Sequence, residues 1–363
     1  MAKITLDNVA HSYIAKPKNQ SDYALRLIDN IWNDGGAYAL LGPSGCGKTT
    51  LLNIISGLLT PSKGRVLFDG KDVTGLPTEK RNIAQVFQFP VLYDTMSVYG
   101  NLAFPLKNRG FNKIDIEKRV LEVAQILDLT DSLNKKAASL TADAKQKISL
   151  GRGLVRSDVA AILFDEPLTV IDPHLKWQLR CKLKQVHEQL KLTLLYVTHD
   201  QIEALTFAEQ VIVMYEGAIV QIGTPQELFE NPSHKFVGYF IGSPGMNFLP
   251  CTIEGNQAMV GDIAIKLNNQ TAALGAEAIG KIELGIRPLY LEIHNTKVEG
   301  SVPTIVKSIE DQGSYKIVTT ILGNNNILRA RLPEGKTCPS EKAWLKFSEN
   351  WIRLFSDDIL LKN

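Results

Sequence analysis

The stretch Tyr38-Ala-Leu-Leu-Gly-Pro-Ser-Gly-Cys-Gly-Lys-Thr-Thr50 restricts the fold of this chain more than any other. Its apolar start predicts a strand, its glycines predict a turn, and its end predicts a helix that begins near Lys48. Glycines allow successive backbone N–H groups to point at one phosphate, and the N-terminus of the helix adds its positive dipole end. The spacing Gly-x-x-x-x-Gly-Lys-[Ser/Thr] is typical of a nucleotide phosphate site. We call residues 42–50 the phosphate loop.

The side chains of the phosphate loop have separate expected roles. Lys48 is expected to neutralise the β- and γ-phosphate oxygens, and the Thr49 hydroxyl is expected to hold Mg²⁺. A glycine turn between a strand and a helix is the simpler interpretation, but it leaves the order of lysine and hydroxyl unexplained. The expected nucleotide-binding residues of the loop are Gly42, Pro43, Ser44, Gly45, Cys46, Gly47, Lys48, Thr49 and Thr50.

Length, charge and cysteine content narrow the class of protein. The 363 residues suffice for two domains, and the net charge of +2 predicts no basic field of the kind that binds nucleic acid. The sequence has no Cys-x-x-Cys pair, which argues against a zinc site or a disulfide framework. No secretory signal and no apolar run near ~18 residues is present, so we expect a soluble chain or one that reaches a membrane through a partner. The four cysteines are Cys46, Cys181, Cys251 and Cys338.

Strand-like and helix-like segments alternate downstream of the phosphate loop. Such alternation implies a largely parallel sheet covered by helices on both faces. Asp172 and Pro173 are expected to cap and open one of the helices. The expected strands are 3–13, 64–68, 159–164, 192–197 and 211–215, and the expected helices are 51–59, 116–129 and 173–190.

The pattern changes near residue 231. Beyond it, short strand-like runs are separated by glycine and asparagine, as in 263–267, 282–286, 316–321 and 343–347. These runs predict an all-β tail of small-barrel type. The expected domains are therefore a nucleotide-binding domain at 1–235 and a β-rich domain at 236–363.

Further polar groups are expected at the same sheet edge as the phosphate loop. Asp165 and Glu166 end an apolar strand, where Asp165 can order Mg²⁺ and Glu166 can orient or deprotonate an attacking water. His199 ends another strand and can contact the γ-phosphate. Gln88 can reach Mg²⁺ or the water, and Tyr13 can stack on adenine. A solvent-facing acidic strand end, a structural histidine and an edge-strand aromatic are the simpler interpretations of these residues.

Two short patterns resemble those of GTPases. Asp72-Val-Thr-Gly75 fits Asp-x-x-Gly, and Asn112-Lys-Ile-Asp115 fits the guanine-binding Asn-Lys-x-Asp. The second pattern requires a buried strand ahead of it, and residues 105–111 predict none. A GTPase would also leave Asp165, Glu166 and His199 without a role. We therefore reject this interpretation.

Together these residues resemble the ATP-binding subunit of an ABC importer of the carbohydrate class, which includes the maltose and glycerol-3-phosphate uptake ATPases. The resemblance covers nearly the whole chain, including stretches 221–225, 240–247 and 285–288 of the linker and tail. It implies a P-loop NTPase domain with a helical subdomain, followed by a small OB-like (TOBE-type) regulatory domain. It also implies Gln88 as the Q-loop glutamine, His199 as the switch histidine, and a D-loop around Asp172.

The same resemblance implies the cellular context. Two ATPase subunits would sandwich two ATP molecules with Mg²⁺ and drive integral-membrane permease subunits. The permeases would be supplied by an extracytoplasmic solute-binding protein, which places the chain at the cytoplasmic face of the inner membrane. A sugar, a polyol such as glycerol, or glycerol phosphate is the class of solute that the family suggests.

The chain departs from this family where members have Leu-Ser-Gly-Gly-Gln, the signature that contacts the other subunit's γ-phosphate. Here the segment is Leu140-Thr-Ala-Asp-Ala144, so both glycines are absent and Asp143 lies where an anion should approach. Two like charges ~4 Å apart repel by about 4 kcal/mol at an effective dielectric constant of about 20. Asp143 as a helix-dipole partner is the simpler interpretation. The D-loop is also altered, to Thr169-Val-Ile-Asp172. The altered signature residues are Thr141, Ala142, Asp143 and Ala144.

The altered signature leaves alternatives for function. We expect a heterodimer in which this chain's phosphate loop pairs with the intact signature of a second ATPase. A regulatory subunit that binds ATP and hydrolyses little is the alternative. A soluble ABC protein of repair or translation is disfavoured, because those proteins usually have two such domains or a long insertion.

Overall fold

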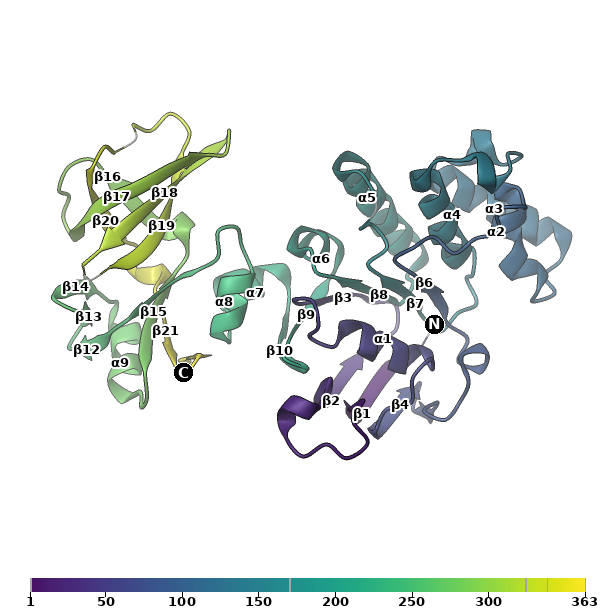
Figure 1. Ribbon diagram of the computed structural model, residues 1–363, viewed down its shortest axis with the longest axis horizontal. Helices are drawn as coiled ribbons and strands as arrows, with labels where there is room; N and C mark the ends of the chain where they lie inside the picture. The colour runs from purple at the N-terminus through teal and green to yellow at the C-terminus, as the bar shows by residue number, and fades with distance from the viewer. Residues whose placement is uncertain (1, 170, 324, 338, 363) are drawn as a thin grey trace. The chain divides into compact units, whose positions relative to one another are not determined.

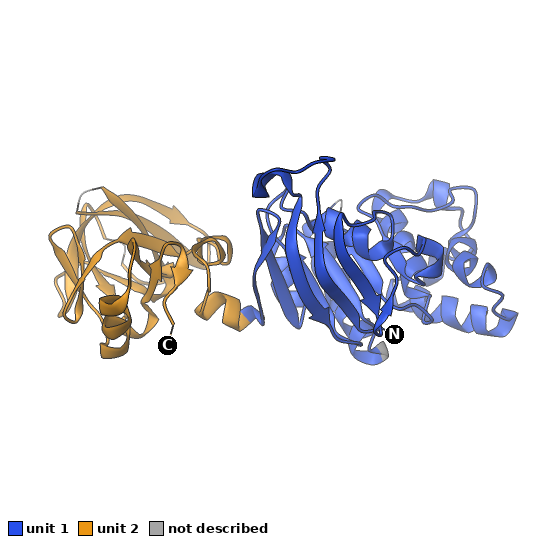
Figure 2. Cartoon of the chain, turned by 90° about the horizontal axis from the view of Figure 1, so that it is seen from below, with its two compact units in different colours: residues 1–225 blue, residues 226–363 orange. Residues whose placement is uncertain are grey.

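A computed structural model describes residues 2–169, 171–323, 325–337 and 339–362. The chain divides into two compact units, residues 1–225 and 226–363 (Figure 2). The boundary expected at 235 lies later in the chain, where helix α8 (Lys235–Phe240) begins. Each unit is described separately below.

The strands described in the N-terminal unit form two sheets. One has the strand order β2-β1-β4-β5 and is antiparallel, whereas the other has the order β10-β9-β3-β8-β7-β6. In the second sheet, β9, β3, β8, β7 and β6 are parallel neighbours and β10 is antiparallel to β9. The strands are β1 Ile4–His11, β2 Leu25–Trp32, β3 Ala37–Leu41, β4 Lys63–Phe68, β5 Lys71–Asp72, β6 Ala84–Val86, β7 Ile162–Asp165, β8 Leu194–Thr198, β9 Gln210–Tyr215 and β10 Ala218–Gly223.

Some helices of this unit cover the parallel sheet, and others form a separate group beside it. Helices α2, α3 and α4 pack against one another, and Figure 1 shows them together at one end of this unit. This group is the helical subdomain that the sequence resemblance implies. The helices are α1 Lys48–Ser56, α2 Val98–Lys107, α3 Lys113–Ile126, α4 Ala142–Leu154, α5 Pro173–Leu190, α6 Gln201–Phe207 and, across the division of the chain, α7 Pro225–Glu230.

The central strand β3 sets the position of the phosphate loop. All five of its residues are buried, and Leu41 at its end pairs with Thr198 of β8 and Val213 of β9. Asp165 at the end of β7 pairs with Val197 of β8 in the same way. Parallel pairing therefore brings the carboxyl ends of β3, β7 and β8 to one edge, as the sequence predicts.

The strand expected at 159–164 begins later than predicted. Strand β7 starts at Ile162, because the Ala160 N–H is used by Asn82, outside the strands, and regular pairing with β6 begins only after it. Ala160 N–H donates to Asn82 O at 2.7 Å, and Ala161 O accepts from Ala84 N–H at 3.1 Å. Val159 is nevertheless buried. The apolar run predicted burial correctly and the strand start wrongly.

The GTPase-like patterns have local structural roles. Asn112 caps α3, since its side chain accepts the Asp115 N–H at 2.9 Å. Asp72 closes a turn by accepting the Thr74 N–H at 2.8 Å. These contacts explain both patterns as cap and turn chemistry.

The described residues of the C-terminal unit form three sheets, with strand orders β11-β15-β21-β22, β12-β13-β14 and β16-β20-β17-β18-β19. The predicted β domain is confirmed, and it also contains α8 and α9 (Asn269–Glu277), of which α9 packs against β12 and β21. Asn268 caps α9 by accepting the Thr271 N–H at 2.8 Å. The strands are β11 Asn247–Pro250, β12 Thr252–Glu254, β13 Gln257–Val260, β14 Ile263–Lys266, β15 Ile282–Ile286, β16 Leu291–His294, β17 Ser301–Asp311, β18 Tyr315–Leu322, β19 Asn326–Pro333, β20 Lys342–Phe347, β21 Arg353–Ser356 and β22 Ile359–Leu360.

A buried arginine joins the first helices of the C-terminal unit to its sheet. Arg287, just after β15, is 2% exposed and donates from Nε to Phe229 O at 2.7 Å. Its Nη1 donates to the carbonyls of Gly238 and Ile241, and its guanidinium lies 4.1 Å from the centre of the Phe229 ring. Burial lowers the pKa of Arg287 to about 10. This side chain satisfies carbonyls at the ends of α7 and α8.

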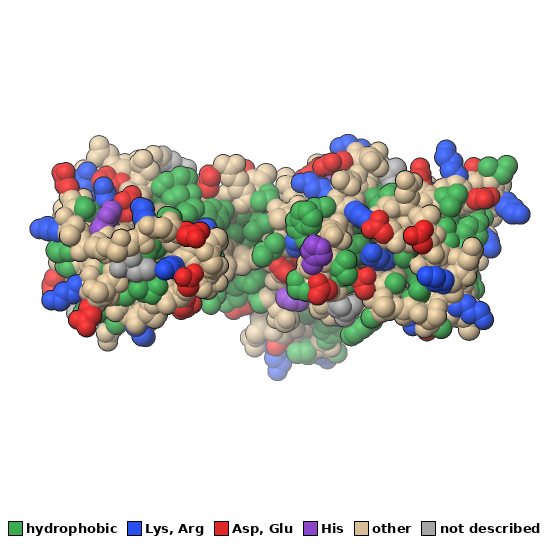
Figure 3. All heavy atoms as spheres, turned by 90° about the horizontal axis from the view of Figure 1, so that it is seen from above, with side chains coloured by type: hydrophobic (Ala, Val, Ile, Leu, Met, Phe, Trp, Pro, Cys, Tyr) green, Lys and Arg blue, Asp and Glu red, His purple; other side chains and the backbone are tan. Residues whose placement is uncertain are grey.

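Other global features are simple. Within the described ranges, every helix is too short or too polar to cross a bilayer. Cys46, Cys181 and Cys251 are free thiols, and Cys338 lies outside the described residues. Basic and acidic side chains are interspersed on the face drawn in Figure 3.

Candidate active site

The phosphate loop has the backbone that an anion cradle requires. Gly45 and Gly47 have φ values of +82° and +100°, a region that favours glycine. A Cβ on Gly42 would lie 2.3 Å from Met214 O, so a side chain is excluded there. Gly47 is the N-cap of α1, and no side chain accepts the first N–H groups of this helix. These donors are therefore available to an anion.

Lys48 is held at the loop by backbone carbonyls. Its side chain is 5% exposed, and Nζ donates to Gly42 O and Pro43 O at 2.9 Å each. Nζ also lies 3.9 Å from the Cys46 sulfur. Burial raises the pKa of the Cys46 thiol, which favours its uncharged form beside the ammonium group. Lys48 forms no ion pair with a carboxylate of the described residues, so its positive charge can be offered to phosphate oxygens.

Thr49 and Asp165 meet across the sheet edge, as predicted. The Thr49 hydroxyl lies 3.4 Å from Asp165 Oδ1. Burial raises the pKa of Asp165, and the negative charge of Glu166 raises it further, while Thr49 and Lys48 oppose the shift. A cation would relieve this crowding of negative charge. These oxygen donors fit Mg²⁺, which is usually held by one or two side chains together with substrate phosphates.

Glu166 and His199 form a pair. Glu166 Oε2 lies 3.0 Å from His199 Nδ1, and it accepts a hydrogen bond from the Thr169 hydroxyl at 3.3 Å. Glu166 has φ +47°, and its N–H donates to Val197 O at 2.9 Å. The backbone therefore turns at Glu166, which directs this carboxylate to the histidine while Asp165 faces Thr49. The His199 side chain is half exposed, so it remains accessible to a ligand.

Tyr13 and Gln88 are less closely tied to this group. Tyr13 is 67% exposed, and its hydroxyl lies 3.1 Å from the Thr50 hydroxyl, beside the phosphate loop. The ring of His11 packs edge-on against Tyr13 with centroids 4.7 Å apart. Gln88 is half-buried and makes no hydrogen bond with any described residue. The structure thus brings Tyr13 to the loop, and leaves the Gln88 amide available.

The altered signature segment forms the start of α4. Thr141 is the N-cap, and its hydroxyl accepts the Ala144 N–H at 3.3 Å. Asp143 lies in the first turn, and its Oδ1 is buried without a hydrogen-bond partner among the described residues. Lys145 cannot fully offset Asp143, because its Nζ pairs with Asp94 at 2.8 Å. Ala142 is exposed at the same helix start.

The remaining residues are one confirmed prediction, the cap of α5, and two residues that sequence reasoning missed. Asp172, singled out for the D-loop, caps α5 by accepting the His174 N–H at 2.9 Å. Sequence reasoning missed buried Gln146, whose Nε2 donates to Pro167 O at 2.6 Å and so joins α4 to the segment after Glu166. It also missed Glu203, which accepts from Tyr196 and Thr198 at 3.0 and 2.9 Å. The only sequence signal for Gln146 was its spacing, which places it on the buried face of α4.

Comparisons with known proteins agree with this geometry. The family model described as "ABC transporter" matches residues 27–169, and the model described as "MalK OB fold domain" matches residues 242–288. Among solved structures, cbiO1 from Clostridium perfringens, part of an ABC transporter complex, has a TM-score of 0.57 and 27% identity over 63% of this chain and 90% of that chain. The ADP- and phosphate-bound dimer of the ATP-binding cassette MJ0796 has a TM-score of 0.54 and 27% identity over 61% of this chain and 98% of that chain.

Full-length relatives give the family. An sn-glycerol-3-phosphate import ATP-binding protein of Escherichia coli O157:H7 is 39% identical over 361 residues, 99% of each chain. The protein of the same description from Salmonella typhi is 38% identical over the same share of each chain. The phosphate loop, the paired acids and the β-rich tail therefore have one explanation: this chain belongs to the ATP-binding subunits of ABC transporters, and it is an ATPase that powers import and ends in a MalK-type OB-fold domain.

Proposed function

We propose that this chain is the ATP-hydrolysing subunit of an importer for glycerol 3-phosphate, a related polyol or a sugar, and that it works with a second, non-identical ATPase subunit. The observation that carries the proposal is the assembly of Lys48, Thr49, Asp165, Glu166 and His199 at one sheet edge, together with the acidic start of α4. The named relatives support the class of solute.

The proposed chemistry divides the work among these side chains. Lys48 and the N–H groups at the start of α1 would bind the phosphates, and Tyr13 would stack on the adenine ring. Glu166 would accept the proton of the attacking water or hold that water in line, with His199 keeping the carboxylate oriented. The Thr169 hydroxyl would hold the same oxygen from the other side.

Thr49 and Asp165 would hold Mg²⁺, with Gln88 as a further oxygen donor. When bound, Mg²⁺ neutralises charge on the phosphate oxygens. Burial and then the Glu166 carboxylate raise the pKa of Asp165, so Asp165 would ionise more readily with a cation bound at this edge. The site is therefore built to gain a cation together with ATP.

The partners follow from the proposed role. Integral-membrane permease subunits would hold the chain at the cytoplasmic face of the membrane, and an extracytoplasmic binding protein would deliver the solute. Solute choice would lie in those partners, because no residue of the ATP site selects it.

The second ATPase subunit is proposed from α4. An ATP sandwich needs the signature helix of one subunit to present N–H groups to the other subunit's γ-phosphate. Here Thr141 already accepts one of those N–H groups, and Asp143 adds negative charge that Lys145 leaves unpaired. ATP bound at this chain's phosphate loop would therefore be hydrolysed in a site completed by the intact signature of a different subunit. The opposite site, built with this chain's α4, would turn over slowly.

A regulatory subunit with little hydrolysis is the second candidate, and the acidic start of α4 favours it. The Glu166–His199 pair argues for hydrolysis, since a purely regulatory site has no use for it. Replacing Glu166 by Gln in the assembled complex separates the two. Loss of ATPase activity supports the first candidate, and unchanged activity supports the second.

The proposal is tested on the complex purified from native membranes. Quantitative mass spectrometry should find this chain and a second ATPase chain in equal amounts. Reconstituted vesicles should accumulate radiolabelled glycerol 3-phosphate, glycerol or maltose only with internal ATP. A complex with this chain as the sole ATPase would contradict the heterodimer, and ATP-independent uptake would contradict the function.

A further inference from the structure

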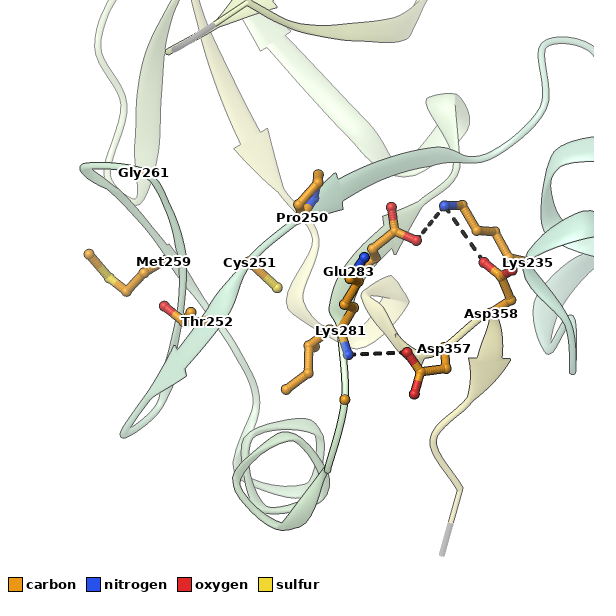
Figure 4. A pocket seen from close by; sticks show the side chains of 12 residues that line it. Lys235, Pro250, Cys251, Thr252, Met259, Gly261, Lys281, Glu283, Asp357 and Asp358 are labelled. Carbon is orange, nitrogen blue, oxygen red and sulfur yellow. Dashed lines mark hydrogen bonds and ion pairs between the residues drawn. The ribbon is translucent and has the colours of Figure 1, made fainter.

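A cavity of about 850 Å³ lies within the C-terminal unit and has no role in ATP chemistry. Figure 4 shows it between the β12–β13 hairpin, with Thr252 and Met259, and the turn after β21, with Asp357 and Asp358. Lys235, the first residue of α8, forms another part of its wall. Its volume falls within the range of about 300–1,000 Å³ that is usual for small-molecule sites.

One wall of the cavity is a fixed carboxylate. The Asp357 N–H donates to Lys281 O at 3.2 Å, and Asp357 Oδ1 accepts the Lys281 N–H at 3.3 Å. A Cβ on Gly280 would lie 2.3 Å from Asp357 Oδ2, so only glycine admits the carboxylate at this position. Asp357 Oδ2 and the Lys281 ammonium form no hydrogen bond or ion pair with any described residue. An acceptor and a donor thus remain free on one side of the cavity.

The charge of the lining excludes anionic ligands. Lys235 Nζ pairs with the Glu283 carboxylate and lies 3.8 Å from Asp358 Oδ1. With Lys281 and Asp357 included, two ammonium groups face three carboxylates, which leaves one net negative charge. A phosphate or carboxylate ligand would be repelled, whereas a neutral ligand that both donates and accepts would satisfy the free groups.

The remaining wall is weakly polar. Pro250, Met259 and Ile282 present apolar surface to the cavity. The Cys251 thiol joins them as an uncharged group, because burial raises its pKa to about 11. A ligand with hydroxyl groups on one side and C–H groups on the other fits both walls.

We propose that this cavity binds a neutral, hydroxyl-rich molecule of sugar size, recognised by Asp357 and Lys281 and packed against Met259 and Pro250. Because Glu283 and Asp358 also face the cavity, hydroxyls that bind them compete with Lys235 at the start of α8. Ligand occupancy therefore alters the contacts of Lys235 at the start of α8. The proposal does not depend on which solute the transporter carries.

Isothermal titration calorimetry on the full chain tests the proposal, with glucose, maltose, glycerol and glycerol 3-phosphate as probes. At least one neutral probe should bind with one site per chain, and glycerol 3-phosphate should bind at least tenfold more weakly than that probe. Absence of binding by all three neutral probes, or tighter binding of glycerol 3-phosphate, would overturn the proposal.

Variants locate the site. Asp357→Asn keeps the acceptor for the Lys281 N–H, and Lys281→Met keeps the length of the side chain, so both should fold and each should weaken binding about tenfold. Glu334→Gln removes the same charge from an exposed position of this unit outside the cavity and should bind like the unchanged chain. Unchanged affinity in Lys281→Met would overturn the proposal even if Asp357→Asn failed to fold.

Discussion

Two helix N-termini in this chain differ in what they leave for a ligand. Helix α1 begins after Gly47, has no acidic residue in its first turn, and has no side chain bonded to its first N–H groups. Helix α4 begins after Thr141, whose hydroxyl accepts the Ala144 N–H, and has Asp143 in its first turn. Both helices have the same backbone dipole.

The difference shows that a helix end becomes an anion site only when its own side chains leave it unsatisfied. The start of α1 gains its partner from outside the chain, with Lys48 adding charge beside it. At the start of α4, Thr141 accepts one N–H group and Asp143 adds a negative charge. We therefore expect this chain to supply a complete phosphate-binding half of an ATP site and a blocked clamp for a second half. The following experiments break or sharpen this contrast.

The largest expected effect comes from Glu166→Gln in the assembled complex. Removing the carboxylate that pairs with His199 should lower ATP turnover roughly 10²–10⁴-fold while ATP binding persists. Steady-state phosphate release and filter binding of labelled ATP provide the two readouts. Equal loss of binding and turnover would mean that Glu166 serves the loop's structure and not the chemistry.

Lys48→Met should also impair the phosphate-binding half of the site, because it removes a charge that would contact the ATP phosphates. The change keeps most of the buried stem and removes the only ammonium that bonds Gly42 O and Pro43 O. We expect turnover to fall roughly 10²–10³-fold, because one preorganised charge opposite the phosphates is lost. Circular dichroism melting serves as the folding control. Normal ATP turnover in this variant would refute the proposal that Lys48 and the N-terminus of α1 bind the phosphates.

The blocked end should be repairable. In the purified chain alone, Ala142→Gly combined with Asp143→Gly should raise ATP turnover about tenfold, since the charge near the phosphate is removed. Asp131→Asn, which removes one charge from the turn between α3 and α4, provides the matched control. No gain in the double variant would show that Asp143 does not block the clamp.

Tyr13→Ala should have a smaller effect that is confined to nucleotide affinity. Loss of base stacking should raise the KM for ATP roughly fivefold to tenfold with kcat unchanged. Tyr13→Phe is the control, because it keeps the ring and loses only the contact with Thr50. A fall in kcat with KM unchanged would contradict stacking.

The smallest effect concerns stability without ligand. The folded pKa of Asp165 is raised above its ordinary value of 3.8, so its ionisation costs stability as pH rises through the folded pKa. Asp165→Asn should therefore raise the Tm of the nucleotide-free chain at neutral pH, and the difference should shrink as the pH falls toward 4. Differential scanning calorimetry across this pH range gives the measurement. A lower Tm for the variant at neutral pH would show that Asp165 is satisfied without a cation.

The sequence predicted most of the sheet-edge site, because each residue follows a strand whose apolar pattern is plain. Parallel pairing then leaves little freedom in where Thr49, Asp165 and His199 meet. The sequence alone could not predict that Lys145 pairs with Asp94 from a distant segment, or that Gln146 donates to Pro167 O. Both contacts depend on how α4 packs. The start of β7 and the helix α9 inside the β-rich tail were likewise decided by tertiary contacts.

Vanadate trapping with photoreactive ATP in the native complex tests the central claim most directly. The contrast between α1 and α4 predicts one trapped nucleotide per pair of ATPase subunits, cross-linked to this chain's phosphate loop. Two trapped nucleotides per pair, or a label found only on the other ATPase subunit, would contradict it.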